Sequence, residues 1–141
     1  MRLVVDTDGG VDDCTALWWL VQQPDVELVA LLATWGNADR DLAAANLRRV
    51  LHAAGRDDVP VALGADDPIG PAPLAARASH VHGDDGLGGH GAAWSEGEAG
   101  YHDTAAGALL DSLTEASPGE LHLLTLGPLS TLALALSLIH I

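Results

Sequence analysis

The chain takes its architecture from Val4-Val5-Asp6-Thr7-Asp8-Gly9-Gly10-Val11-Asp12-Asp13, where an apolar strand gives way to a helix. Four carboxylates fall within these residues, and like charges this close repel one another and raise one another's pKa. A hard divalent cation such as Ca²⁺ or Mg²⁺ relieves the repulsion because it takes oxygen ligands. We therefore predict a metal site at the carboxyl end of a first β-strand. The alternative is an acidic loop with a helix cap, which needs only one aspartate.

The spacing of these carboxylates suggests separate tasks for them. Asp6 and Asp8 lie two residues apart, so they point the same way along an extended strand. Gly9 and the glycine after it allow a sharp turn. A cation held by Asp8 and Asp13 would lower the pKa of a bound water, whose proton Asp8 is placed to accept. Asp12, in the first helical turn, remains available to hydrogen-bond a ligand hydroxyl.

Composition and charge restrict the classes of partner. The 141 residues suit one domain, and 48% of them are hydrophobic, which is enough for a core. A formal net charge of -14 disfavours binding to nucleic acid or to anionic membranes. No apolar run reaches the roughly 18 residues of a membrane span, and the N-terminus lacks a signal-peptide pattern. We expect a cytoplasmic protein.

Strand and helix patterns alternate along the chain. Strands are expected over residues 2–7, 26–34, 59–63 and 121–126, and helices over 11–23, from 39 or 41 to about 54, over 104–115 and from about 130. Asp103 is expected to cap the helix over 104–115. This alternation predicts an α/β fold, with an open, mostly parallel, Rossmann-like sheet and flanking helices. The Pro- and Gly-rich residues 64–102 are expected to form a long loop region.

Three segments of this pattern follow predicted strands directly: residues 6–13, 35–37 and 126–129. Ligands of open α/β sheets bind beyond the carboxyl ends of the strands. We therefore expect these segments to converge on one site.

Asn37, His82 and Cys14 have two interpretations each. Asn37 is either a ligand-binding amide or a turn residue. His82 either contacts a substrate or is a solvated loop histidine. Cys14 is either a nucleophile or a small buried residue, and the buried interpretation is favoured because cysteine is among the most buried residue types. Trp18 and Trp19 are expected to be core or helix-packing residues.

Four segments, in order, resemble motifs of the inosine/uridine-preferring nucleoside hydrolases. The residues from Asp6 to Asp13 are similar to the N-terminal aspartate motif of that family, which usually has proline where Gly9 stands. The other three are Trp35-Gly36-Asn37, His82-Gly83-Asp84-Asp85-Gly86-Leu87-Gly88-Gly89 and Leu126-Gly127-Pro128-Leu129-Ser130-Thr131. In the last of them Ser130 and Thr131 replace Thr-Asn of the family.

The resemblance implies a Ca²⁺-dependent enzyme that hydrolyses the N-glycosidic bond of ribonucleosides to free base and ribose. Carried over by position, Asp8 and Asp13 would bind calcium together with the backbone carbonyl of Leu126. Asp8 would also be the base that activates water, and Asp6 would support the site.

The resemblance also implies how a ribonucleoside would be bound. Asp12 would bind a ribose hydroxyl, Asn37 would lie near the ribose and the water, and His82 would line the base pocket. A full-length member would be a homo-oligomer. The base preference is not predicted, because most base contacts of the family belong to its later half.

The resemblance covers only the first half of a family member. We expect residues 1–136 to be the N-terminal part of a nucleoside hydrolase domain, and residues 137–141 to be a tail outside the family pattern, arising from truncation. One alternative is a truncated, non-catalytic relative that binds a cation or a ribosyl ligand. Another is a phosphotransferase of the haloacid dehalogenase type, but Gly10 stands where that family has Thr or Val.

Overall fold

The computed structural model describes residues 1–70, 78–97, 101–102 and 104–139. Its strands are β1 (Arg2–Thr7), β2 (Glu27–Ala33), β3 (Val61–Leu63), β4 (Tyr101–His102) and β5 (Leu121–Thr125). Its helices are α1 (Val11–Leu20), α2 (Arg40–Ala53), α3 (Ser79–His82), α4 (Ala105–Glu115) and α5 (Ser130–Ile139), with a short 3-10 helix at Gly91–Ala93.

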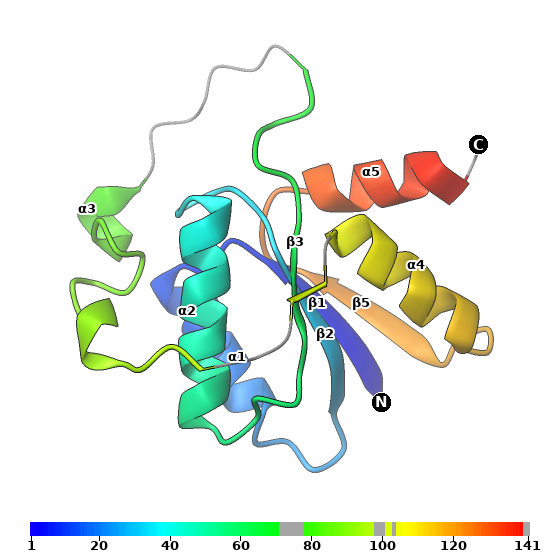
Figure 1. The fold of residues 1–141 in the computed structure, drawn as a ribbon, viewed down its shortest axis with the longest axis horizontal. Helices are drawn as coiled ribbons and strands as arrows, with labels where there is room; N and C mark the ends of the chain where they lie inside the picture. The colour runs from blue at the N-terminus through cyan, green and yellow to red at the C-terminus, as the bar shows by residue number, and fades with distance from the viewer. Residues whose placement is uncertain (71–77, 98–100, 103, 140–141) are drawn as a thin grey trace.

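The five strands form one sheet in the order β4-β3-β2-β1-β5, and every pairing in it is parallel. Helices α1 and α2 cover one face of the sheet, and α4 and α5 cover the other (Figure 1). The predicted α/β architecture with a parallel sheet and flanking helices is therefore confirmed.

Side-chain alternation along β1 builds the two cores. Leu3 and Val5 pack with α1 and α2, whereas Val4 packs on the opposite face with residues of α4 and α5. Because β1 lies between β2 and β5, it is buried on both faces, as parallel strands usually are. The carboxyl end of β1 therefore opens between the ends of β2 and β5, where the aspartate motif begins.

Element boundaries differ from expectation in three places. Helix α1 ends at Leu20, and the chain then turns before Pro24 instead of continuing to residue 23. Strand β3 begins only after Pro60, which has no backbone N–H to donate to a ladder. Strand β4 pairs with β3 inside the region expected to be a loop. The expected helix cap at residue 103 lies outside the described residues.

Trp18 and Trp19 do not pack in the core, so that part of the expectation is wrong. Their side chains are 40% and 61% exposed. The buried face of α1 is formed by Cys14, Leu17 and Leu20, which are spaced three residues apart and leave the two indoles on the outer side of the helix.

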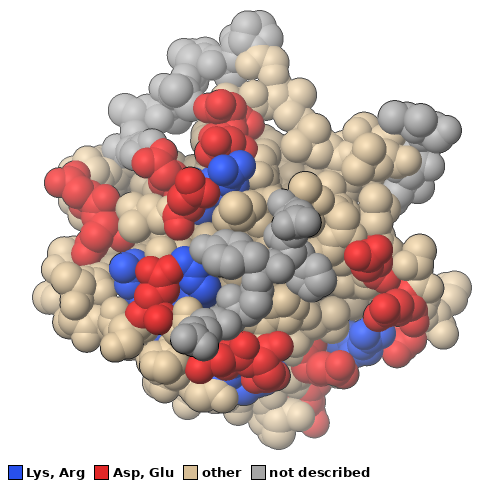
Figure 2. Space-filling model, viewed as in Figure 1, with Lys and Arg blue, Asp and Glu red and all other residues tan. Residues whose placement is uncertain are grey.

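Acidic side chains outnumber basic ones, 20 to 6. On the face drawn in Figure 2, Asp and Glu form several groups, and most of the Arg side chains lie against them. Ion pairs such as Arg56 with Asp58 and Arg40 with Asp66 account for some of these contacts.

Candidate active site

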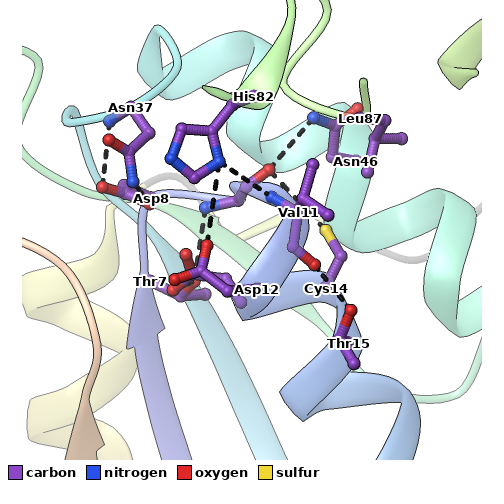
Figure 3. A network of polar contacts seen from close by, with 12 residues as sticks. Thr7, Asp8, Val11, Asp12, Cys14, Thr15, Asn37, Asn46, His82 and Leu87 are labelled. Atoms are coloured by element: carbon purple, nitrogen blue, oxygen red, sulfur yellow. Dashed lines mark hydrogen bonds and ion pairs between the residues drawn. The ribbon is translucent and has the colours of Figure 1, made fainter. Parts of the chain in front are cut away.

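Asp8 lies just beyond the end of β1 and is held by the loop after β2. The backbone N–H of Asn37 donates to Oδ2 of Asp8 at 2.9 Å, and the Asn37 side-chain amide donates to Oδ1 at 3.4 Å (Figure 3). Gly36 makes this approach possible, because a Cβ on it would overlap the Asp8 carboxylate. Asp8 is only 5% exposed, so its two oxygens are oriented by these contacts.

Asp13 reaches back from the first turn of α1 toward the same point. Its Oδ1 accepts a hydrogen bond from the Thr7 hydroxyl at 2.7 Å. The pKa of Asp13 is raised to about 7, mainly by burial and in part by the neighbouring Asp8 carboxylate, which lies within hydrogen-bond reach. The Thr7 hydroxyl acts in the opposite direction. Asp8 and Asp13 are thus paired carboxylates that repel each other when both are ionised.

Asp6 is the most buried of the four aspartates, at 1% exposure. Burial raises its pKa to about 7, the Thr131 hydroxyl lowers it, and the Asp8 carboxylate raises it. Within the part of the chain that the structure describes, neither carboxylate oxygen of Asp6 accepts a hydrogen bond of standard geometry. A buried carboxylate without a partner calls for an explanation, and a supporting position behind a bound cation would supply one.

His82 stands over the N-terminus of α1. Its Nδ1 accepts a hydrogen bond from the backbone N–H of Val11 at 3.3 Å and lies 3.7 Å from Oδ1 of Asp12 (Figure 3). The ring rests on Gly10, where a Cβ would come within 2.9 Å of Nδ1. The imidazole is 7% exposed, so the prediction of a solvated loop histidine is wrong. Asp12, in contrast, has a side chain that is 80% exposed.

Asn46 of α2 ties the aspartate motif to the loop that carries His82. Its fully buried amide donates to the carbonyl of Gly9 at 3.1 Å and to the carbonyl of Asp85 at 2.9 Å. The Asp85 carboxylate in turn accepts three backbone hydrogen bonds from Leu87, Gly89 and Gly91. These hydrogen bonds lower the pKa of Asp85. The glycine-rich loop is therefore folded around one carboxylate.

The segment after β5 completes the edge of the site. The N–H of Leu126 donates to the carbonyl of Asp6 at 2.8 Å, and a Cβ on Gly127 would lie 3.1 Å from the backbone nitrogen of Asp8. Trp35 Nε1 donates to the Ser130 hydroxyl at 3.0 Å. The predicted convergence of residues 6–13, 35–37 and 126–129 is confirmed.

The donor set fits part of a shell for a divalent cation. Two adjacent carboxylates, Asp8 and Asp13, have the chemistry that Ca²⁺ prefers, and their repulsion supplies a reason to bind it. Ca²⁺ takes about 6–8 oxygen ligands. Among the described residues, however, no group of three or more His, Cys, Asp or Glu side chains is arranged to hold a metal. Backbone carbonyls, water, substrate or residues beyond this chain would have to supply the rest.

Cys14 is a structural residue. Its thiol is buried, lies 3.6 Å from the carbonyl of Gly9, and has a pKa that burial raises to about 12. A thiol with that pKa is not a nucleophile near neutral pH. The favoured interpretation of Cys14 as a small buried residue is confirmed.

Comparison with known sequences decides the family. The family model described as "Inosine-uridine preferring nucleoside hydrolase" matches residues 3–139. The chain belongs to this family. The resemblance of the four ordered motifs is therefore confirmed, and the phosphotransferase alternative is set aside.

Individual relatives agree with this assignment. The chain is 38% identical over 136 residues to a protein from Oryza sativa subsp. japonica named probable uridine nucleosidase 2, covering 96% of this chain and 40% of that protein. It is 37% identical to uridine nucleosidase 1 of Arabidopsis thaliana, covering 96% and 39% respectively. A solved inosine-guanosine nucleoside hydrolase superposes with a TM-score of 0.87 at 32% identity, covering 97% of this chain and 43% of that one.

The chain thus spans about 40% of the length of the nucleoside hydrolase relatives that it matches. In the described ranges, no helix is long and apolar enough to cross a membrane. Helix α5 continues to Ile139, and the family match ends at the same residue. The division between residues 1–136 and a tail over 137–141 stays a prediction.

Several residues of this nucleoside hydrolase site were not found from the sequence. Thr7 lies inside the quoted motif, but its pattern is that of an ordinary strand residue. Asn46 has the pattern of one polar position in an amphipathic helix. Thr131 donates to Thr34 at 3.1 Å and also accepts from the N–H of Ala65, joining α5 to the ends of two strands. Each acts through contacts distant in sequence, which spacing alone does not reveal. Asp85 could have been suspected, since an aspartate followed by glycines favours a turn in which its side chain accepts backbone hydrogen bonds.

Proposed function

We propose that this chain forms the aspartate-bearing part of a Ca²⁺-dependent ribonucleoside hydrolase, which cleaves the N-glycosidic bond to give free base and ribose. The observation that carries the proposal is the position of Asp8, which contacts Asn37 on one side and pairs with Asp13 on the other. In a member of the nucleoside hydrolase family, this arrangement suits a carboxylate that both helps to hold a cation and accepts a proton.

Asp8 is the base of the proposed reaction. Both hydrogen bonds from Asn37 orient its carboxylate, so one oxygen can accept the proton of an attacking water while the amide keeps the other fixed. Asp8, Asp13 and the backbone carbonyl of Leu126 would hold Ca²⁺, which when bound lowers the pKa of water. Asp6, buried behind Asp8, supports the charge of the site.

The substrate would be held above this cluster. The exposed Asp12 carboxylate is available to bind a ribose hydroxyl, with Asn37 nearby, and His82 would line the pocket of the base. Glycosidic cleavage develops positive charge on the sugar, which the surrounding carboxylates stabilise. We also propose that the full-length enzyme is a cytoplasmic homo-oligomer that serves nucleoside salvage.

A second candidate function is binding without turnover. The described residues supply Asp8 and Asp13 but no third acidic or histidine side chain arranged for a metal. A protein with this partial shell would bind a cation or a ribosyl ligand weakly and hydrolyse nothing.

The two functions separate in one experiment on the purified 141-residue chain. Calcium binding is measured by calorimetry, and release of ribose from inosine and uridine is measured with Ca²⁺ or with a chelator. We expect calcium binding that is lost in Asp8→Asn and retained in Asp111→Asn, a matched change at an exposed residue of α4. We expect weak or absent turnover by this chain and turnover by a chain that spans the full length of its relatives.

Three results would count against these assignments. Calcium-independent ribose release would refute the metal requirement. Release that persists in Asp8→Asn would refute the role of Asp8. A full-length chain that binds calcium and ribose but releases no base would favour the binding function.

A further inference from the structure

A cavity of about 260 Å³ lies beside the candidate active site and is separate from it. It is enclosed by α1, α2 and the segment after the glycine-rich loop. Its walls include Val11 and Trp18 from α1, Arg49 from α2, and His90 and Trp94 beyond the loop. None of Asp6, Asp8 or Asp13 lines it, so the metal and substrate chemistry proposed above does not explain it.

Two indole rings form one wall of this cavity. Trp18 and Trp94 meet edge to face, with ring centroids 6.4 Å apart and an interplanar angle of 86°. Both remain substantially exposed, at 40% and 43%. Aromatic rings bury large areas and prefer such edge-to-face or offset contacts. A third ring entering the cavity would cover indole surface that is now in water.

Basic side chains line the cavity, although the chain as a whole is acidic. The protein has 20 acidic and 6 basic residues, yet the cavity is lined by Arg49 and His90 and by no Asp or Glu. Glu96 contacts both Arg48 and Arg49, so two guanidinium groups share this carboxylate. The cavity therefore offers positive charge next to aromatic surface.

The Arg49 guanidinium is held in place by contacts with Asn46 and Glu96. Its Nη1 donates to the Asn46 side chain at 2.8 Å, and its Nη2 lies 3.8 Å from Glu96. The Nε–H group is buried and, among the described residues, donates to no acceptor. Nη2 lies beyond hydrogen-bond distance of Glu96, so this end of the guanidinium can donate to the carboxylate of a ligand.

We propose that this cavity binds a small aromatic carboxylate, with its ring against Trp18 and Trp94 and its carboxylate facing Arg49. The size fits one or two rings, because cavities of about 150 Å³ hold benzene and drug-sized ligands need about 300–1,000 Å³. The site is distinct from the hydrolase site and does not rest on the proposed function. The two are adjacent, since Val11 lines the cavity and also donates its N–H to His82.

The test uses 2-naphthoate as the probe and the indole N–H signals of the ¹⁵N-labelled 141-residue chain as the readout. The chain has four tryptophans, of which Trp19 and Trp35 do not line the cavity and serve as internal controls. We expect saturable shifts of the Trp18 and Trp94 signals, with a dissociation constant on the order of 0.1–1 mM. The Trp19 and Trp35 signals should not move.

Two comparisons test the charge and the aromatic wall separately. The neutral 2-naphthamide has nearly the same shape and should bind about tenfold more weakly, as should naphthoate to Arg49→Gln. Trp94→Ala should reduce naphthoate binding. Trp19→Ala should not, because Trp19 lies on the same helix as Trp18 but is 61% exposed and outside the cavity. Because Arg49 also contacts Asn46, the Trp94 variant keeps the test decisive if Arg49→Gln fails to fold.

Three outcomes would overturn the proposal. One is the absence of saturable shifts at Trp18 and Trp94 up to about 10 mM naphthoate. Another is equal affinity for naphthamide and naphthoate, which would remove the role of the positive charge. The third is a shift at Trp35 alone, which would place the ligand in the hydrolase site instead.

Discussion

The backbone N–H of Val11 donates to Nδ1 of His82 across the first turn of α1, at 3.3 Å. A ring nitrogen that accepts a hydrogen bond carries no proton, so the neutral imidazole must carry its proton on Nε2. The helix N-terminus thereby fixes which nitrogen of His82 is a donor. In the proposed base pocket, His82 would present an N–H group to an acceptor on the nucleobase.

This tautomer can be observed directly. In the neutral ring of His82, we expect ¹⁵N chemical shifts typical of a protonated Nε2 and an unprotonated Nδ1. The variant Gly10→Ala places a Cβ where it would come within 2.9 Å of Nδ1, and should return His82 to a tautomer mixture. Ring signals that show a protonated Nδ1 in the wild-type chain would contradict the prediction.

Gly36→Ala should impair the site while leaving the fold in place. The added Cβ would overlap Oδ2 of Asp8, so the carboxylate has to leave its contact with Asn37. We expect calcium affinity, measured by calorimetry, to fall about tenfold or more. Gly55→Ala is the control, since its positive φ strains the backbone but nothing lies within 4 Å of its Cβ. Equal losses of affinity in both variants would point to general destabilisation.

The free energy of unfolding of the metal-free chain should fall as the pH rises from about 4 to about 7. Burial raises the pKa of Asp6 and of Asp13 to about 7, so the folded chain binds more protons than the unfolded chain between about pH 4 and pH 7. Their contribution to stability is therefore complete below about pH 4 and is lost as the pH rises to about 7. We expect a loss on the order of 2 kcal/mol between pH 5 and pH 8, measured by urea unfolding.

Matched variants assign this pH dependence. Asp13→Asn keeps an oxygen that can accept from the Thr7 hydroxyl but removes the charge beside Asp8, so it should flatten the profile and stabilise the chain at pH 8. Asp111→Asn, at an exposed position of α4, should leave the profile unchanged. A wild-type chain that gains stability from pH 5 to pH 8 would exclude the explanation.

Asn46→Ala should loosen the connection between the aspartate motif and the glycine-rich loop. The change removes the hydrogen bonds to the carbonyls of Gly9 and Asp85 and the one that Arg49 donates to the Asn46 side chain. We expect a loss of about 2–3 kcal/mol in the free energy of unfolding. Hydrogen exchange should also become faster at the amides of residues 83–91.

Gln22→Ala provides the comparison for Asn46. Its side chain also donates to a backbone carbonyl, that of Trp18, but at an exposed position. Its loss should change the free energy of unfolding by less than about 0.5 kcal/mol. Exchange rates in residues 83–91 that are unchanged in Asn46→Ala would show that the loop is held by other contacts.

The sequence was informative wherever local pattern and tertiary structure agree. Continuous apolar runs predicted β1 and β2, because strands buried on both faces need apolar residues at most positions. Strand β5 was predicted from a similar run, although it lies at the edge of the sheet and is only partly buried. The motif from Asp6 to Asp13 placed the site, since a parallel sheet collects the carboxyl ends of its strands at one edge. The meeting of Asn37 with Asp8 followed from this rule.

Other features could not be predicted because they depend on contacts between distant segments. Strand β4 has only Tyr101 and His102, too short for any periodicity. Asn46 matters because of two loops that fold over it, and nothing in its helix marks it. Trp18 and Trp19 were misplaced because an indole is usually buried, whereas here the small and branched side chains of α1 occupy the core.

The place of β1 between β2 and β5 has a consequence for the order of folding. Its partners are β2, the next strand, and β5, which is almost the whole chain away. Closing such a long loop costs entropy that local structure does not offset, and contacts of this kind form late and slowly. The aspartates leave the ribosome first, yet the part of the sheet edge beside them that β5 forms exists only after β5 has docked. Assembly of the site therefore reports on the docking of β5 against β1.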